Sequence, residues 1–185
     1  MAPAQIHHHL FDTAIGACGL AWSARGLAAV SLPEKDRADT ERRLIAKSGS
    51  AGAAPPPAGI AALIADIQRY LAGERVDFSA VAVDLAQVDD FRRKLYAALR
   101  DVGFGRTTTY GELAKTLGLA DWEGARDVGE AMGRNPAPIV IPCHRVLAAG
   151  NKLGGFSAYG GTRTKEKLLA LEGVHFDRAP RLPGF

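Results

Sequence analysis

The stretch "GRNPAPIVIPCHRV", residues 133–146, constrains the fold more than any other part of the sequence, because its prolines restrict the backbone. Its three prolines remove backbone donors and exclude a helix, so residues 134–142 are expected to form an extended, stiffened loop. The loop leads to Cys143, which His144 and Arg145 follow directly. We therefore expect Cys143 to be held at a fixed place, as a structural thiol, a metal ligand or a nucleophile.

Metal binding and simple burial are the alternatives to a nucleophilic role for Cys143. A zinc site needs three or four ligands at short spacing, and Cys143 with His144 has no nearby partner pair. The histidines at 7–9 are interpreted as an exposed N-terminal tail, so no metal site is predicted. Cys18, the other cysteine, lies in an apolar stretch and is interpreted as a small buried hydrophobe. Two such distant cysteines form no disulfide framework, which favours a reducing, cytoplasmic setting.

A nucleophilic cysteine must become a thiolate, so Cys143 needs a base or a positive charge beside it. His144 and Arg145 adjoin it, but neighbouring side chains on an extended backbone point to opposite faces. Direct contact between Cys143 and His144 is therefore not expected, and a proton would pass between them through a water molecule. A histidine that acts as a base also needs an orienting carboxylate, and Glu172 is the candidate.

Length and composition indicate a globular protein of one large domain or two small ones. The 185 residues are 47% apolar and 23% charged. No apolar run approaches the roughly 18 residues of a membrane span, and no signal peptide is evident. The net charge of +3 is uneven, with 8 basic against 9 acidic residues in 1–87 and 15 against 11 in 88–185. The second half is where a polyanion is expected to dock, although such an excess is also typical of a solvated face.

The first half of the chain is expected to form a small α/β unit over residues 1–87. Alternating apolar residues around a Ser-Ala-Arg-Gly turn indicate strands, and apolar residues at helical spacing indicate an amphipathic helix. The expected elements are a hairpin over 13–32, a helix over 39–49, a flexible connection at 49–59, a helix over 60–72 and a strand over 81–85.

The second half is expected to be mostly helical. Thr109 and Glu112 have the spacing of a capping box, which marks a helix start. The expected helices are 91–102, 107–119, 123–133 and 162–173. The second and third of these are short and joined by a tight turn, which fits a helix-turn-helix and an ordinary helical hairpin equally well.

These motifs together resemble one known family. "GRNPAPIVIPCHRV", with "TTTYGELA" upstream and "KEKLLALEG" downstream, is similar to the O6-alkylguanine-DNA alkyltransferases, also called methylated-DNA–protein-cysteine methyltransferases. The resemblance covers about residues 88–175 and implies a mixed α/β (α+β) fold. It implies a ribonuclease-H-like α/β domain over 1–87, a mostly helical DNA-binding and alkyl-transfer domain with a helix-turn-helix over 88–175, and a tail over 176–185.

The resemblance implies a single, irreversible transfer of an alkyl group from O6-alkylguanine in DNA to the protein's own cysteine. Cys143 would be the attacking thiolate, with His144 taking its proton through water and Glu172 orienting the imidazole. Tyr110 matches the hydroxyl donor to the leaving guanine, and Asn135 matches the residue that braces the reactive loop. No cofactor is implied, and O4-alkylthymine is a second candidate substrate.

The resemblance further implies that the protein binds double-stranded DNA in the minor groove and flips the damaged base out. Arg126 matches the arginine that fills the gap left in the duplex. Ser157 matches a serine that contacts O6, although two extra residues separate it from the last helix. A cytoplasmic monomer is expected, nucleoid-associated in a bacterium, and cooperative binding to DNA stays open. The other expected DNA contacts are Arg92, Arg93, Lys94, Gly111 and Arg134.

Two other functions fit part of the sequence. A non-reactive DNA-binding protein that flags lesions or regulates transcription would share the basic second half. A cysteine hydrolase would share the pair Cys143 and His144, but it needs an oxyanion site, and no glycine-rich nucleophile elbow surrounds Cys143. The presence of the thiol favours the alkyltransferase over alkyltransferase-like proteins that lack it.

Overall fold

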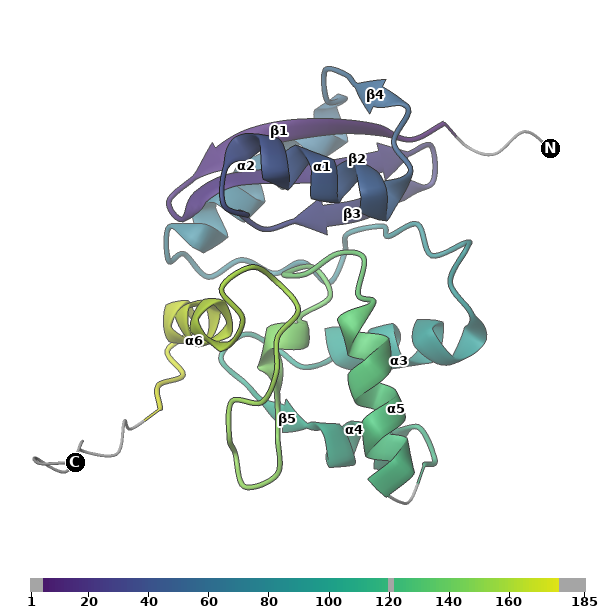
Figure 1. Cartoon of the computed structure of the whole chain (residues 1–185), viewed down its shortest axis with the longest axis vertical. Helices are drawn as coiled ribbons and strands as arrows, with labels where there is room; N and C mark the ends of the chain where they lie inside the picture. The colour runs from purple at the N-terminus through teal and green to yellow at the C-terminus, as the bar shows by residue number, and fades with distance from the viewer. Residues whose placement is uncertain (1–4, 120–121, 177–185) are drawn as a thin grey trace, which may run out of the picture.

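A computed structural model of the chain describes residues 5–119 and 122–176. The strands and helices form a mixed α/β fold, as predicted, with the four-stranded sheet at one end and most helices at the other (Figure 1). In chain order the elements are β1 (His7–Thr13), β2 (Gly16–Ser23), β3 (Gly26–Ser31), α1 (Arg37–Ser48), β4 (Gly52–Ala53), α2 (Ala58–Leu71), α3 (Asp90–Arg100), β5 (Thr108–Thr109), α4 (Tyr110–Thr116), α5 (Trp122–Gly133), the short 3₁₀ helix η1 (Cys143–Arg145), β6 (Val146–Leu147) and α6 (Thr162–Leu171).

The sheet has the strand order β3-β2-β1-β4, and only the β1–β4 pair is parallel. The predicted hairpin is confirmed as β2 and β3, with its turn closing at Gly26. Gly26 has a φ of 129°, and a side chain there would place its Cβ 2.5 Å from the carbonyl oxygen of Ala82. Only glycine fits this position, because the turn touches the backbone of the segment after α2.

The two faces of the sheet are buried against different helices. Along β2, the alternating side chains of Cys18, Leu20 and Trp22 enter the main core, which also contains residues of α2. Ala21 points the other way and packs with Leu44 of α1. Figure 1 accordingly shows α1 in front of the sheet and α2 behind it.

Three expectations for the first half of the chain are wrong. The histidines at 7–9 begin β1 instead of forming a tail, and strand alternation buries His8, whose ring lies 2.8 Å from Ser50 Oγ. The connection at 49–59 contains β4, which pairs with β1. The strand expected at 81–85 is reduced to one isolated bridge, from Val83 to Leu27.

The helices expected in the second half are present. The capping box at the start of α4 is confirmed: Glu112 donates its backbone N–H to Thr109 Oγ1, and Thr109 donates its backbone N–H to Glu112 Oε2. Parallel pairing of β5 with β6 joins Thr108 to Val146. This pairing holds the start of α4 beside the strand that follows Cys143, which sets the geometry of the site.

One hydrophobic core runs through both halves of the chain. It includes Leu27 of the sheet, Ile67 of α2, Leu99 of α3 and Leu168 of α6. A backbone hydrogen bond of 2.9 Å from Val30 to Pro136 ties the edge strand β3 to the proline-rich loop. The predicted tail lies outside the described residues except for its first residue. No helix in the described part of the chain is long and apolar enough to cross a membrane.

Candidate functional site around Cys143

The proline-rich loop is compact, so the expectation of an extended segment at 134–142 is wrong. The side-chain amide of Asn135 donates to the carbonyl of Ile141 (2.8 Å) and accepts from the N–H of Ala137 (3.0 Å). Ile139, a β-branched residue, has a φ of 75°, a strained conformation that the surrounding packing must hold. Asn135 therefore braces the loop from inside, where prolines leave few backbone donors.

Cys143, His144 and Arg145 form a single 3₁₀ turn, which corrects the assumption of an extended backbone at this point. The expected separation of thiol and imidazole nevertheless holds. His144 Nε2 faces Glu172, while Nδ1 is buried and has no hydrogen-bond partner among the described residues. The turn buries all three side chains, and Nδ1 is the ring nitrogen of His144 that stays without a hydrogen bond to the described residues.

The carboxylate of Glu172 is the centre of a buried hydrogen-bond network. His144 Nε2 lies 2.8 Å from Oε1, and the guanidinium of Arg145 donates from Nε and Nη2, each at 2.9 Å from a carboxylate oxygen. The hydroxyl of Tyr70 donates to Oε1 at 2.6 Å, and the backbone N–H of Gly105 donates to Oε2 at 3.1 Å. Donors from three separate segments thus meet on one carboxylate at the end of α6.

The surroundings set the charge state of each group. Burial alone would raise the pKa of Glu172, but hydrogen bonds from His144, Arg145 and Tyr70 hold it well below its usual range. Burial lowers the pKa of His144, and Glu172 opposes this only in part. Burial raises the pKa of the Cys143 thiol. At neutral pH the site therefore holds a carboxylate, a neutral imidazole and a protonated thiol, so a base must take the thiol proton.

Cys143 lines a cavity of about 280 Å³ that opens between α4, α5 and the loop before α6. Tyr110, the first residue of α4, contributes its ring, and Gly129 and Gly154 approach that ring closely without a side chain. The ammonium of Lys165 lies 5.9 Å from the Tyr110 ring and is fully buried, and burial lowers its pKa to about 8. A planar base entering this cavity would meet the thiol and the tyrosine together.

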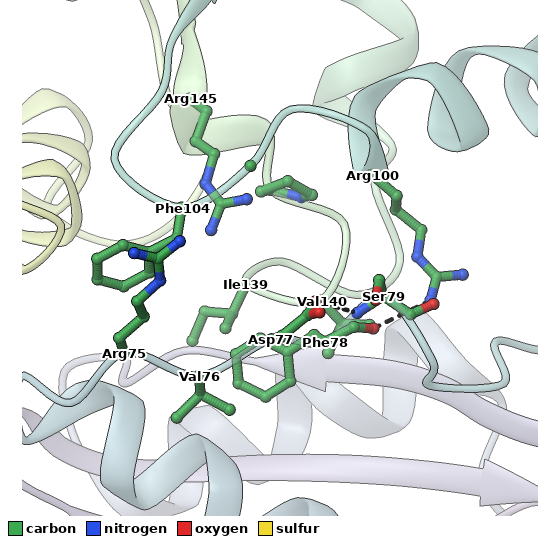
Figure 2. A pocket seen from close by; sticks show the side chains of 12 residues that line it. Arg75, Val76, Asp77, Phe78, Ser79, Arg100, Phe104, Ile139, Val140 and Arg145 are labelled. Atoms are coloured by element: carbon green, nitrogen blue, oxygen red, sulfur yellow. Dashed lines mark hydrogen bonds between the residues drawn. The ribbon is translucent and has the colours of Figure 1, made fainter.

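A second cavity of about 180 Å³ lies behind the reactive loop (Figure 2). Arg145, Phe104 and Arg75 lie at one side of it, and Arg100 and Ser79 lie at the other. Cys143 does not line this cavity, so the candidate base-binding site is the cavity that Tyr110 and the thiol share.

The expected phosphate contacts lie on helices at the surface, and most are paired with a neighbouring carboxylate. Arg92 pairs with Asp89, and Arg134 pairs with Glu130 at 2.9 Å. Arg93 is likewise paired with the acidic residue three positions earlier. Such exposed pairs contribute about 0–1 kcal/mol, so a phosphate can replace the carboxylate at little cost.

The remaining expected DNA contacts lie on α3, α4, α5 and the loop before α6. Arg126 is exposed on α5, and Gly111 is half-buried in the first turn of α4. Ser157 is exposed and lines the cavity, while its carbonyl accepts a hydrogen bond of 2.8 Å from Arg43 of α1. Lys94 is exposed on α3.

Sequence reasoning missed three residues of the site. Arg145 was noted only as a neighbour of the cysteine, and neither Tyr70 nor Lys165 was selected. Lys165, Leu168, Leu169 and Glu172 follow at spacings of three or four, so the inner face of α6 was a readable signal. Tyr70 follows Leu63 and Ile67 at helical spacing, which indicates burial. Its part in the site carried no signal, because its polar partners lie in the other half of the chain.

The described residues contain no group of three or more His, Cys, Asp or Glu side chains placed to hold a metal ion. Both cysteines are free. Cys18 is fully buried in β2, and burial raises the pKa of its thiol to about 12, so it matches the structural role expected for it. Cys143 alone borders the cavity between the helices.

Comparisons with known proteins agree with this arrangement. Residues 90–174 match the family model described as 6-O-methylguanine DNA methyltransferase, DNA binding domain. A methylated-DNA–protein-cysteine methyltransferase of Mycolicibacterium paratuberculosis is 40% identical over 119 residues, which are 64% of this chain and 68% of that protein. A crystal structure of an OGT variant of Mycobacterium tuberculosis has a TM-score of 0.72 at 32% identity, covering 97% of this chain and 98% of the other. The OGT of the same organism in complex with DNA has a TM-score of 0.71 at 33% identity, covering 90% and 92%.

The fold and the site define a class of proteins in which a buried cysteine lines a cavity between the helices of a DNA-binding domain. The chain belongs to the methylated-DNA–protein-cysteine methyltransferase family, since the likeness extends over both halves of the chain. The resemblance seen in the sequence is thereby confirmed.

The buried pair of Glu172 and Arg145 should support the fold far more than an exposed pair of the same residue types. Glu172→Gln leaves a buried guanidinium without its counter-charge, and we expect the free energy of unfolding to fall by about 3–5 kcal/mol. Glu130→Gln breaks the exposed pair with Arg134 and should cost less than about 1 kcal/mol. Urea denaturation of both variants measures the difference, and equal losses would contradict this account of the network.

Proposed function

We propose that the protein repairs DNA by moving the alkyl group of O6-alkylguanine to Cys143 in one irreversible step. The observation that carries the proposal is the position of the thiol. It borders the cavity between the two helices of the DNA-binding domain and is backed by the His144 and Glu172 network. A reactive group placed anywhere else would not meet a base delivered by those helices.

The proton of the thiol is proposed to leave through His144. Nε2 of His144 is hydrogen-bonded to Glu172, so Nδ1 is the nitrogen that can accept a proton. Nδ1 is buried and has no hydrogen-bond partner among the described residues. Because the thiol does not reach it directly, one water molecule relays the proton. The thiolate sulfur then forms a bond to the alkyl carbon as the bond from that carbon to O6 breaks.

The electron pair of the broken bond leaves on guanine, which must take up a proton. Tyr110 is the proposed hydroxyl donor. Burial and the nearby Cys143 raise the pKa of its phenol, so it stays protonated and able to donate at neutral pH. The product is a thioether, which thiols do not exchange, and Cys18 is buried in the sheet. Each molecule therefore reacts once, without a cofactor.

DNA is proposed to bind across α4 and α5 in the minor groove, with the alkylated base flipped into the cavity. Arg126 fills the gap in the duplex, and Ser157 contacts the base at the cavity mouth. Asn135 keeps the reactive loop in place. The phosphate backbone of the DNA is contacted by Arg92, Gly111 and Arg134. The proposed setting is a cytoplasmic, nucleoid-associated monomer, and O4-alkylthymine is the second substrate to test.

The transfer has a direct chemical test. The protein is incubated with a duplex carrying O6-methylguanine, and its peptides are analysed by mass spectrometry. We expect one methyl group per molecule on the peptide that contains Cys143, none on the peptide of Cys18, and none in Cys143→Ala. An unmodified Cys143 peptide in protein that binds the lesion would show that the chain only recognises damage.

The role of Arg126 is tested by comparing two substrates. Arg126→Ala should slow methyl transfer from the duplex by at least about tenfold, because flipping costs a few kcal/mol that the arginine helps to offset. Transfer from O6-methylguanine as the free base needs no flipping and should be unchanged. The control, Arg42→Ala, removes an exposed arginine of α1 and should affect neither rate. Equal slowing with both substrates would contradict the role of Arg126.

A further inference from the structure

Tyr70 lies outside the matched DNA-binding domain, yet its hydroxyl is at the centre of the reactive network. It belongs to the last turn of α2 and is 1% exposed. Its hydroxyl oxygen is 2.6 Å from Glu172 Oε1 and 3.1 Å from His144 Nε2. The first half of the chain thus supplies a hydroxyl to the network on Glu172, whose other members belong to the second half.

The ring of Tyr70 is held by aromatic neighbours. Phe78 packs edge-to-face against it with ring centroids 5.7 Å apart, and Phe104 does so at 6.3 Å. Both phenylalanines line the cavity behind the reactive loop (Figure 2). Two crossed rings leave the tyrosine little rotational freedom, so its hydroxyl is fixed in position.

The hydroxyl places a second acceptor beside Nε2 of His144. Burial, and then Glu172, raise the pKa of Tyr70, so the group remains a neutral phenol. Its single proton is donated to Glu172 Oε1, which turns its lone pairs toward Nε2. His144 Nε2 therefore faces two acceptors, the carboxylate and the phenol oxygen, and must carry the proton itself. The other nitrogen, Nδ1, is left as the free base.

We propose that Tyr70 is a positioning residue for alkyl transfer: by donating to Glu172 and presenting its oxygen to Nε2, it keeps the imidazole of His144 neutral, so that Nδ1 stays available as the base. The inference rests on the proposed function and deepens it. The site is incomplete without the first half of the chain, and α2 is part of the reactive assembly as well as of the core.

Removing the hydroxyl changes the balance of charges around His144. The groups that act on this imidazole are Glu172, Arg145, Lys165 and the Tyr70 hydroxyl. Without the phenol, Glu172 has one donor fewer and attracts the imidazole proton more strongly. We therefore expect Tyr70→Phe to raise the pKa of His144, and the transfer rate to begin falling at a higher pH on the acid side.

The experiment compares the full-length wild-type protein with Tyr70→Phe and Tyr96→Phe. Tyr96 is a matched control, because it is fully buried and its hydroxyl donates to the Ala131 carbonyl (3.0 Å), away from Glu172. Rates of methyl transfer from O6-methylguanine free base are measured from pH 5 to 9, and the pKa of His144 is followed by NMR. At pH values below the raised pKa of His144, Tyr70→Phe should react about tenfold more slowly, a smaller loss than the 10²–10⁴-fold that a positioned base contributes. In Tyr70→Phe, the acid limb of the pH–rate profile and the pKa of His144 should both shift to higher pH. Tyr96→Phe should keep the wild-type values.

The outcomes separate the two proposals. An unchanged rate and an unchanged His144 pKa in Tyr70→Phe would overturn the role of Tyr70. A slower reaction with an unshifted pH profile would also overturn it, because it would mark a purely structural effect. If the wild-type protein transfers no methyl group, the proposed function fails, and the NMR titration still decides whether Tyr70 controls His144.

Discussion

The structure depends on one buried negative charge, the carboxylate of Glu172. A buried carboxylate is costly unless it is paired and fully hydrogen-bonded, and here Arg145, His144, Tyr70 and Gly105 satisfy it together. These partners come from α2, the loop before β5 and the 3₁₀ turn, while Glu172 itself follows the end of α6. Forming the network therefore requires the two halves of the chain to be docked and the reactive turn to be in place.

The same network explains why the thiol is both protected and reactive. Burial keeps Cys143 protonated in the closed site, which protects it from reaction with solvent oxidants or other electrophiles. Under the proposed function, the neutral imidazole of His144 takes the thiol proton through the relaying water once a substrate aligns its alkyl carbon with Cys143. If Cys143 reacts only once, as proposed, this protection matters, because a side reaction of the thiol would inactivate the molecule.

Local sequence patterns predicted the parts of the fold that depend on local interactions. The capping box of Thr109 and Glu112 and the hairpin turn at Gly26 were identified because their partners lie within a few residues. Prolines ruled out a helix before Cys143, but they did not distinguish an extended loop from the compact one that Asn135 closes.

Long-range contacts had no comparable signature in the sequence. Tyr70 and Glu172 are 102 positions apart, and only packing of α2 against α6 brings them together. Cys143, His144 and Glu172 were selected from the chemistry that a nucleophilic cysteine needs, and Tyr110 and Asn135 through family resemblance. The structure places all five around one cavity and its supporting network. The burial of His8 was missed because three adjacent histidines look like a solvated tail.

The central claim is that Glu172 and its partners keep the proton of His144 on Nε2 and leave Nδ1 as the base. The most direct measurement is the pair of ring ¹⁵N chemical shifts of His144 in the wild-type protein at neutral pH. The account predicts a protonated Nε2 and an unprotonated Nδ1. A proton on Nδ1, or a doubly protonated ring, would contradict it.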